Sequence, residues 1–365
     1  MRNTNIFQTN NIQEKLHFWQ HVILKRDTAQ SKQILLELED QNIHSISSDQ
    51  LYGYYYLLKY GHHILVHEFD EANRCFVELE DYHPSFNTEE MFFFYFFQGI
   101  KCKISSESYQ EALAFYRQAE QLVPSIIQDA PVAELSYQIA TVLFELIKSF
   151  ESLGYVQKAY ALFQKLGDYV RMWGCQILIG LNCIDIHQYK EAERRFHLAL
   201  KEADKTKDIS LKKKTYHDLG LLYSKQSLPK AAVRWLLEAN KIGELSYKTP
   251  ILLCQEYCKL NQIDEAKKWY DTALPLYEKL DNQPNIMRLK LLHVIYIDSQ
   301  KKDFELILRQ GMAYFEKHGY WEYILDFAPF LTKFLYEHDR YQESIKYYEL
   351  IIASQQKIYV SEALN

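Results

Sequence analysis

Two copies of one pattern stand between Cys175 and Ala239 and decide the fold: CQILIGLNCIDIHQYKEAERRFHLAL (175–200) and TYHDLGLLYSKQSLPKAAVRWLLEAN (215–240). Each copy has a glycine followed at the same offsets by alanine, a large apolar residue and alanine: Gly180, Ala192, Phe196 and Ala199, then Gly220, Ala232, Leu236 and Ala239. A small residue in one helix lets a neighbouring helix approach closely, and the alanine stripe flattens the second helix. This is the tetratricopeptide signature of two antiparallel helices per unit.

Length and composition agree with a repeat array. A chain of 365 residues exceeds what one compact core usually serves, whereas each unit of an array packs only on its neighbours. The 48% of hydrophobic and 25% of charged residues are ordinary for a globular protein. The low counts of 11 Gly and 8 Pro, with 29 Tyr and 20 Phe, suit packed helices. We therefore predict an all-α protein.

Weaker copies of the pattern fill most of the chain after Met91, so we expect six to seven units. The two strong copies are 40 residues apart (220 − 180) instead of about 34, which requires longer helices or loops. Before the repeats, apolar periodicity predicts two helices within 11–39 and a third from Gln50 towards Val66. We predict an N-terminal helical bundle (1–68), a linker helix region (69–90) and a tetratricopeptide-repeat domain (91–365).

Charge and hydropathy restrict the partners. A formal charge of −6 and a pI near 6.1 argue against a generally nucleic-acid-binding surface. No stretch approaches the roughly 18 consecutive apolar residues of a membrane span, and residues 1–11 lack the apolar run of a secretory signal. We expect a cytoplasmic protein that contacts neither nucleic acid nor a membrane directly.

The metal-ligand and catalytic patterns are weak. Cys254 and Cys258, like His63 and His67, are spaced by four residues, but no second ligand pair and no zincin-type glutamate accompanies them. Free cysteine usually packs as a small apolar residue, so we predict no metal site. A Gly-rich phosphate loop, a nucleophile elbow and a catalytic carboxylate pair are also missing from the sequence. The residues alone therefore predict a binding protein, with a groove lined by the first helix of each unit.

Residues outside the repeats carry a more specific resemblance. One set of positions that carries the resemblance has a spacing of four residues: Trp19, Ile23 and Asp27. A second set follows it in the next predicted helix: Asp49, Gln50, Tyr55, Tyr56, Leu58 and His63. Further matches lie in the repeats: Gln176, Asn182, Asp185, Phe315-Glu316-Lys317, Asp326-Phe327-Ala328 and Tyr341-Gln342-Glu343-Ser344. On these residues the whole chain resembles the Rap family of response-regulator aspartate phosphatases of Bacillus and relatives. It departs from the family at Gly61, where an aromatic residue is usual, and at His62, where arginine is usual.

The resemblance implies a quorum-sensing protein of two parts, of the kind that controls sporulation and competence. The bundle and linker would bind a response regulator, with Asp49, Tyr55 and His63 among the contacts. Gln50 matches the glutamine that enters the regulator's active site and assists hydrolysis of its aspartyl phosphate. A neutral amide orients the attacking water without repelling the phosphoryl oxygens. The metal ion would belong to the regulator, so we expect no cofactor in this chain.

The repeat domain, by the same resemblance, binds a short signalling peptide that shifts the protein to a compact, inactive form. The peptide-binding candidates are Gln176, Asn182, Asp185, Tyr216, Asp218 and Asp326. Asn182 and Asp185 lie on one helix face, where an amide would pair with a peptide backbone and a carboxylate with a basic residue or a free amine. The family usually has asparagine where this chain has Asp218, so anchoring there would depend on charge. The alternative is that Asn182 satisfies a neighbouring helix and that Asp185 is solvated, while aromatic residues at repeat spacing, such as Tyr216, belong to the core.

Three functions remain open at this point. The first is the peptide-inhibited phosphatase. The second is a non-enzymatic, peptide-regulated antagonist that binds the DNA-binding domain of a transcription factor and leaves Gln50 idle. The third is a generic repeat adaptor. Only the first predicts phosphate release from a regulator, and only the first two predict compaction on peptide binding.

Overall fold

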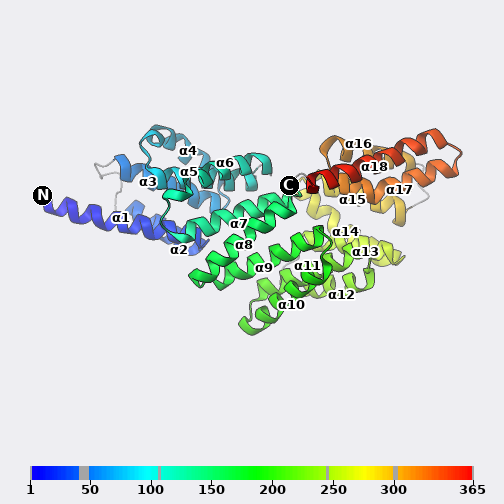
Figure 1. Ribbon diagram of the computed structural model, residues 1–365, viewed down its shortest axis with the longest axis horizontal. Helices are drawn as coiled ribbons and strands as arrows, with labels where there is room; N and C mark the ends of the chain where they lie inside the picture. Colours follow the sequence, from blue (N-terminus) through cyan, green and yellow to red (C-terminus); the bar gives the residue numbers. More distant parts are fainter. Residues whose placement is uncertain (1, 41–48, 106–107, 244–245, 299–302, 364–365) are drawn as a thin grey trace. The chain divides into compact units, whose positions relative to one another are not determined.

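The computed structural model describes residues 2–40, 49–105, 108–243, 246–298 and 303–363. Within these ranges the chain forms 18 α-helices and no β-strand (Figure 1), which confirms the all-α prediction. In chain order the helices are α1 (Arg2–Leu24), α2 (Thr28–Asp40), α3 (Asp49–Leu65), α4 (Phe69–Tyr82), α5 (Thr88–Ser105), α6 (Tyr109–Leu122), α7 (Asp129–Glu145), α8 (Ser149–Leu166), α9 (Tyr169–Asp185), α10 (Tyr189–Thr206), α11 (Ile209–Lys225), α12 (Pro229–Asn240), α13 (Lys248–Lys259), α14 (Ile263–Lys279), α15 (Gln283–Leu292), α16 (Phe304–His318), α17 (Trp321–Glu337) and α18 (Tyr341–Ala363). None of them is long and apolar enough to cross a membrane.

Consecutive helices form pairs, and one turn geometry recurs between the two helices of a pair. His67, Ile147, His187 and Ser227 occupy such turns with φ between 57° and 62°, and their numbers differ by multiples of 40. A residue in this left-handed region ends a helix and reverses the chain. The extra residues of the 40-residue period lengthen the helices, since α9 has 17 residues and α10 has 18.

The two glycines of the strong copies lie where helices approach closely. A Cβ atom added at Gly180 would lie 2.5 Å from the ring of Phe196, and one added at Gly220 would lie 2.5 Å from Cγ of Leu236. Phe196 and Leu236 are the large residues of the alanine stripe on the second helix of each pair. The close approach inferred from the sequence is therefore confirmed at both positions.

The chain divides into two compact units. One consists of residues 1–146 and 151–175, the other of residues 147–150 and 176–365, so α9 passes from the first unit into the second. Each unit has its own apolar core. The first is rich in aromatic side chains such as Trp19, Tyr60 and Phe93, and the second is built mostly from α13 to α17. The functional division at residues 68 and 90 stays a prediction.

A buried chain of hydrogen bonds joins the first three helices. Trp19 Nε1 donates to Ser31 Oγ at 2.8 Å, and Ser31 Oγ lies 2.7 Å from His62 Nδ1. Burial, aided by the neighbouring His63, lowers the pKa of His62 to about 4, so its Nδ1 can accept the Ser31 proton at neutral pH. Gly61 is also internal, because a Cβ there would lie 2.6 Å from the ring of Phe97. The two departures from the family pattern therefore lie in the core and not on the surface of the bundle.

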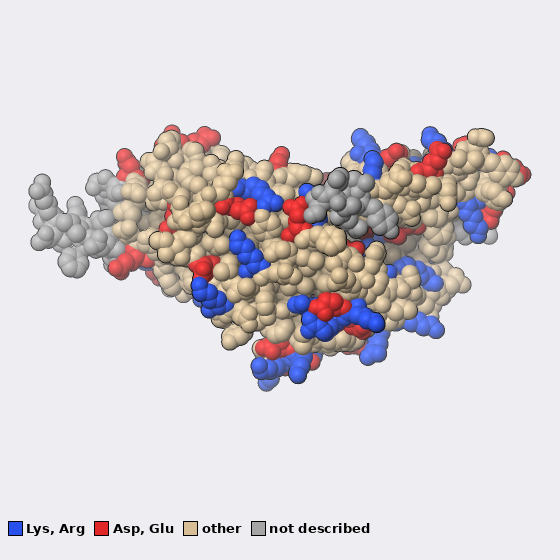
Figure 2. All heavy atoms as spheres, in the orientation of Figure 1, with Lys and Arg blue, Asp and Glu red and all other residues tan. Residues whose placement is uncertain are grey.

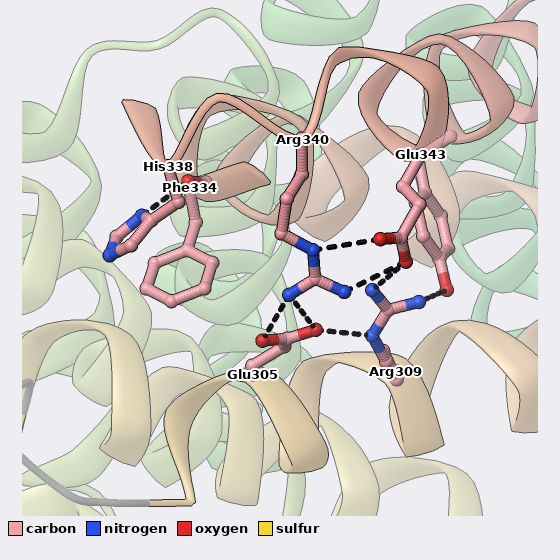
Figure 3. Close-up of polar contacts among 7 residues, drawn as sticks. Glu305, Arg309, Phe334, His338, Arg340 and Glu343 are labelled. Atoms are coloured by element: carbon pink, nitrogen blue, oxygen red, sulfur yellow. Dashed lines mark hydrogen bonds and ion pairs between the residues drawn. The ribbon is translucent and has the colours of Figure 1, made fainter. Parts of the chain in front are cut away.

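A network of two arginines and two glutamates joins α16 to the last helix pair (Figure 3). Arg340 Nη1 lies 2.8 Å from both carboxylate oxygens of Glu305, and its Nε lies 2.7 Å from Glu343. Arg309 contacts the same two carboxylates, at 2.7 Å from Glu305 and 2.5 Å from Glu343. The hydrogen bonds from Arg340 and then Arg309 lower the pKa of Glu343 to about 2. Each guanidinium thus bridges both carboxylates and holds α16 against α18.

Acidic and basic side chains are interspersed on the face of the molecule drawn in Figure 2. That face therefore has no extended region of a single sign that would attract a polyanion.

Candidate functional site

The first helices of three successive pairs end in charged residues at equivalent positions. Asp185 ends α9, Lys225 ends α11 and Lys259 ends α13. Each lies five residues after the small residue of its unit, which is Gly180, Gly220 or Cys254. Because the pairs of a repeat array stack in register, equivalent positions on successive first helices face the same side. The repeat therefore projects a row of charges from the ends of these helices.

Asp185 and Asp326, two of the residues proposed for peptide binding, line one pocket of the second unit. The pocket has a volume of about 220 Å³. Residues from the α7–α8 turn, from α9 to α11 and from α17 and α18 complete its lining: Ile147, Ile184, His187, Tyr189, Lys225, Glu322, Leu325, Gln355 and Ile358. We call it the 185–326 pocket. The fold thus brings together two carboxylates that are far apart in the sequence.

The 185–326 pocket carries an excess of negative charge. Lys225 Nζ lies 2.8 Å from Glu322 Oε2, and Ser149 Oγ donates to Asp185 Oδ2 at 3.2 Å. Burial lowers the pKa of Lys225, but the carboxylates of Glu322, Asp185 and Asp326 outweigh this effect, so the pKa is raised overall. Burial raises the pKa of Asp326, although the positive charges of Arg288 and Lys225 act in the opposite direction. Three carboxylates against one lysine leave a formal charge of −2, which suits the cationic group of a ligand.

Ile147 is a second unusual feature of the pocket. Its φ of 59° lies in the left-handed region, where a β-branched residue is a genuine outlier. Such strain costs on the order of 1 kcal/mol and is frequent at ligand clamps. Sequence reasoning missed Ile147, Lys225 and Glu322. Only Lys225 had a usable signal, because it repeats the position of Asp185 after 40 residues.

The other four peptide-binding candidates do not line this pocket. Gln176 is buried and accepts a hydrogen bond from Arg195 at 2.5 Å. Asn182 is fully buried, and its amide donates to the carbonyl oxygen of Leu178 at 2.8 Å. Asp218 is also buried, and the ring of Tyr216 packs against a neighbour, Trp235, at 5.5 Å between centroids. These side chains take part in helix packing, and their role in peptide binding stays a prediction.

Gln50, the candidate catalytic residue, is exposed in the first turn of α3, next to the exposed Asp49. Its side chain lies near the carboxyl group of Glu90, which is buried at the start of α5. Glu90 also accepts from the backbone N–H of Asn87 at 2.8 Å, while its own N–H donates to Asn87 Oδ1 at 3.0 Å. This reciprocal pair is a capping box, which explains why a carboxyl group lies beneath Gln50. Burial raises the pKa of Glu90.

The other two predicted regulator contacts are internal. The ring of Tyr55 is buried against Trp19, with 6.0 Å between centroids. His63 is buried as well, and its Nδ1 lies 2.8 Å from Glu68 Oε2. Only Asp49 and Gln50 of the four predicted positions reach the surface. Tyr55 and His63 shape α3 from within, and their assignment as contacts stays a prediction. Among the described residues, no three His, Cys, Asp or Glu side chains gather as metal ligands.

These features define an array of helix pairs with an accessible glutamine on its N-terminal helices and an acidic pocket in its repeats. No protein-family model matches the chain. Regulatory protein RapF of Bacillus subtilis is 21% identical over 364 residues, or 94% of each chain. Response regulator aspartate phosphatase A of the same species is 23% identical over 367 residues, or 96% of each chain. Transcriptional activator NprA of Geobacillus stearothermophilus is 22% identical over 92% of this chain and 86% of the relative.

Solved structures agree with this similarity. A Rap protein complexed with competence and sporulation factor superposes with a TM-score of 0.82 at 18% identity, covering 97% of this chain and 99% of that one. NprR in complex with its cognate peptide NprX superposes with a TM-score of 0.77 at 18% identity, covering 95% and 98%. The chain is therefore similar over nearly its full length to Rap regulatory proteins and shares their fold.

Proposed function

We propose that this protein is a peptide-inhibited phosphatase that acts in the cytoplasm on the aspartyl phosphate of a two-component response regulator. The observation that carries the proposal is the exposure of Gln50 beside Asp49 at the start of α3. The similarity over nearly the full chain to response regulator aspartate phosphatase A supports it. Gln50 is the residue that would reach into the regulator, and Asp49 would contact the regulator's surface.

The chemistry requires little from this chain. An acyl phosphate is already reactive, and the regulator's own acidic pocket supplies the metal ion. The Gln50 amide would donate to a phosphoryl oxygen and accept from the attacking water, which holds that water in line with the phosphorus. A carboxylate at this position would repel the phosphoryl group.

The 185–326 pocket supports a peptide ligand with a cationic group, either a basic side chain or the free amine. Asp185, Glu322 and Asp326 would neutralise that group, and the apolar side chains of Ile184 and Leu325 would cover its aliphatic part. Among the solved structures of similar fold, that of NprR holds its cognate peptide. Peptide binding at the pocket would favour the inactive form of the protein.

The test is the lifetime of phosphorylated candidate regulators, measured with no added protein, with wild type, and with Gln50→Ala or Gln50→Glu at equal concentration. Wild type is expected to shorten the lifetime, and both variants are expected to leave it unchanged while still binding the regulator. Adding a short peptide with one basic residue should restore the long lifetime for wild type but not for Asp326→Asn. An active Gln50→Ala protein would remove Gln50 from the mechanism.

The second candidate function is a non-enzymatic, peptide-regulated antagonist of a transcription factor. One observation favours it: one relative of similar length is a transcriptional activator. This function predicts binding to a regulator's output domain with no change in phosphate lifetime. That result would replace the phosphatase proposal.

A further inference from the structure

Two adjoining cavities of the first unit lie apart from the sites described above. The larger, of about 680 Å³, lies between the ends of α1 and α8 and the starts of α7 and α9. The smaller, of about 130 Å³, lies between the C-terminal halves of α1, α3 and α5. Leu24, Arg26 and Glu134 line both cavities, so the two spaces meet at these side chains. None of the residues predicted to contact a regulator or a peptide lines either one.

The smaller cavity is apolar. Nine of its twelve lining residues are apolar, and the largest side chains among them come from three helices: Ile64, Leu65, Phe96, Phe97, Ile100 and Ile23. Empty space beside such side chains costs them their dispersion contacts. It also holds water poorly, because water there finds few polar partners. The smaller cavity therefore suits an apolar group.

The larger cavity has two cations that an anion can reach. Lys25 is exposed and forms no ion pair with another described residue. Arg26 is 41% exposed, and its Nη2 lies 3.4 Å from Glu134 Oε1, which is a long contact. Glu134 also pairs with Arg171 and accepts from Gln138 Nε2 at 2.8 Å. Arg26 can therefore turn to a ligand without leaving the buried Glu134 carboxylate unpaired.

The larger cavity combines this charge with apolar surface. Three cations and two carboxylates give its lining a formal charge of +1 (3 − 2) with histidine neutral: Lys25, Arg26, Arg171, Glu134 and Asp168. Burial and the charge of Lys25 lower the pKa of His21, so this histidine adds no charge at neutral pH. Three exposed apolar side chains line the side formed by α8 and α9: Leu166, Tyr169 and Val170. Such a lining favours an amphipathic anion over an inorganic one.

We propose that the two cavities together bind a medium-chain fatty acid. Its carboxylate pairs with Lys25 and with the guanidinium fork of Arg26, and its alkyl chain passes Leu24 into the smaller cavity. One carboxylate balances the formal charge of +1, whereas a phosphate monoester carries close to two negative charges. The order of the parts is set by the lining, because the cations lie on the larger cavity and the apolar walls enclose the smaller one.

Isothermal titration calorimetry of the full chain with acetate, hexanoate, octanoate and decanoate, below their micelle concentrations, tests the proposal. Each methylene group that enters the smaller cavity should lower the Kd about fourfold, until the chain outgrows the space. Octanol and octyl phosphate should bind more weakly than octanoate, and octyltrimethylammonium should not bind. These three probes share one chain length, so they separate the role of the head group from that of the chain.

Variants test the head-group contacts. Lys25→Gln and Arg26→Asn should each raise the Kd of octanoate at least about threefold. Asparagine is chosen because Arg26 has a φ of 58°, which asparagine tolerates. Lys32→Gln, at an exposed lysine of α2 that also lacks an ion pair among the described residues, is the matched control and should leave the Kd unchanged. Circular dichroism checks that each variant is folded.

Two further variants give results that a general loss of structure cannot produce. Glu134→Gln should lower the Kd of octanoate about threefold, because it removes the competing partner of Arg26 and a negative charge near the head group. Leu65→Trp should fill the smaller cavity and abolish the gain in affinity with chain length, while acetate binding stays as in wild type.

Three outcomes overturn the proposal. The first is octanoate binding no tighter than acetate, and the second is equal binding of octanoate and octanol. The third is tighter binding of a short acidic peptide than of any alkyl carboxylate, which would assign the cavities to a protein partner. The proposal does not depend on Gln50, so it stands or falls separately from the phosphatase.

Discussion

Replacing Asp218 by asparagine tests whether one buried carboxyl group makes the stability of the repeats depend on pH. Asp218 is 4% exposed on α11, and its Oδ2 has no hydrogen-bond partner among the described residues. Burial raises the pKa of Asp218 from 3.8 to about 6, although Lys214 and Lys248 oppose the shift. Above about pH 6 the folded chain must therefore hold a poorly solvated negative charge.

The sign of the effect follows from proton binding. Because the folded-state pKa is higher than the unfolded-state pKa, the folded protein binds the proton more tightly, and the free energy of unfolding falls as pH rises from about 4 through about 6. A shift of about 2 units corresponds to about 3 kcal/mol once the group is ionised in both states. About 2 kcal/mol of this falls between about pH 4.5 and about pH 7.5. Asparagine does not ionise, so the variant lacks this loss.

The assay is urea-induced unfolding followed by far-UV circular dichroism at both pH values. The free energy of unfolding of Asp218→Asn, relative to wild type, is expected to rise by about 2 kcal/mol from the lower to the higher pH. Any free-energy cost of burying the new amide N–H groups does not depend on pH, so it cancels when the two pH values are compared. Asp264→Asn, at an exposed position on α14, should show no such rise. A difference that is the same at both pH values would refute the argument, because it would mean that the Asp218 carboxylate is solvated or paired.

Two further predictions concern packing. Gly180→Ala should destabilise the protein by about 1–3 kcal/mol, because the new Cβ would lie 2.5 Å from the ring of Phe196 on the next helix. Gly154→Ala should instead stabilise the protein by about 0.5–1 kcal/mol, because no atom lies within 4 Å of the new Cβ. Equal urea midpoints for the two variants would contradict this. Glu134→Leu should cost about 3 kcal/mol and increase hydrogen exchange in α1 and α9, because the buried Glu134 carboxylate pairs with both Arg26 and Arg171. Unchanged hydrogen exchange in both helices would show that the two ion pairs of Glu134 are not needed to stabilise α1 and α9.

The site was only partly predictable from the sequence. Asp185 could be placed, since its distance from Gly180 puts it at the end of the first helix of a repeat, where it lines the pocket. Asn182 lies three residues earlier on the same helix, yet its amide turns to its own backbone at Leu178. Helical spacing gives the approximate direction of a side chain, but the neighbouring helices decide whether that direction leads into a groove or into the core.

The sequence by itself determined that the chain is an all-α array of helix pairs. That information is local: the offsets between Gly180, Ala192 and Phe196 describe one pair, and each pair needs only its neighbours to bury its apolar face. Only the tertiary structure decided that Asp185 and Asp326 share a pocket and that Asp218 lies in the core. Both outcomes depend on how neighbouring helix pairs pack on one another, which the residue pattern of a single pair does not show.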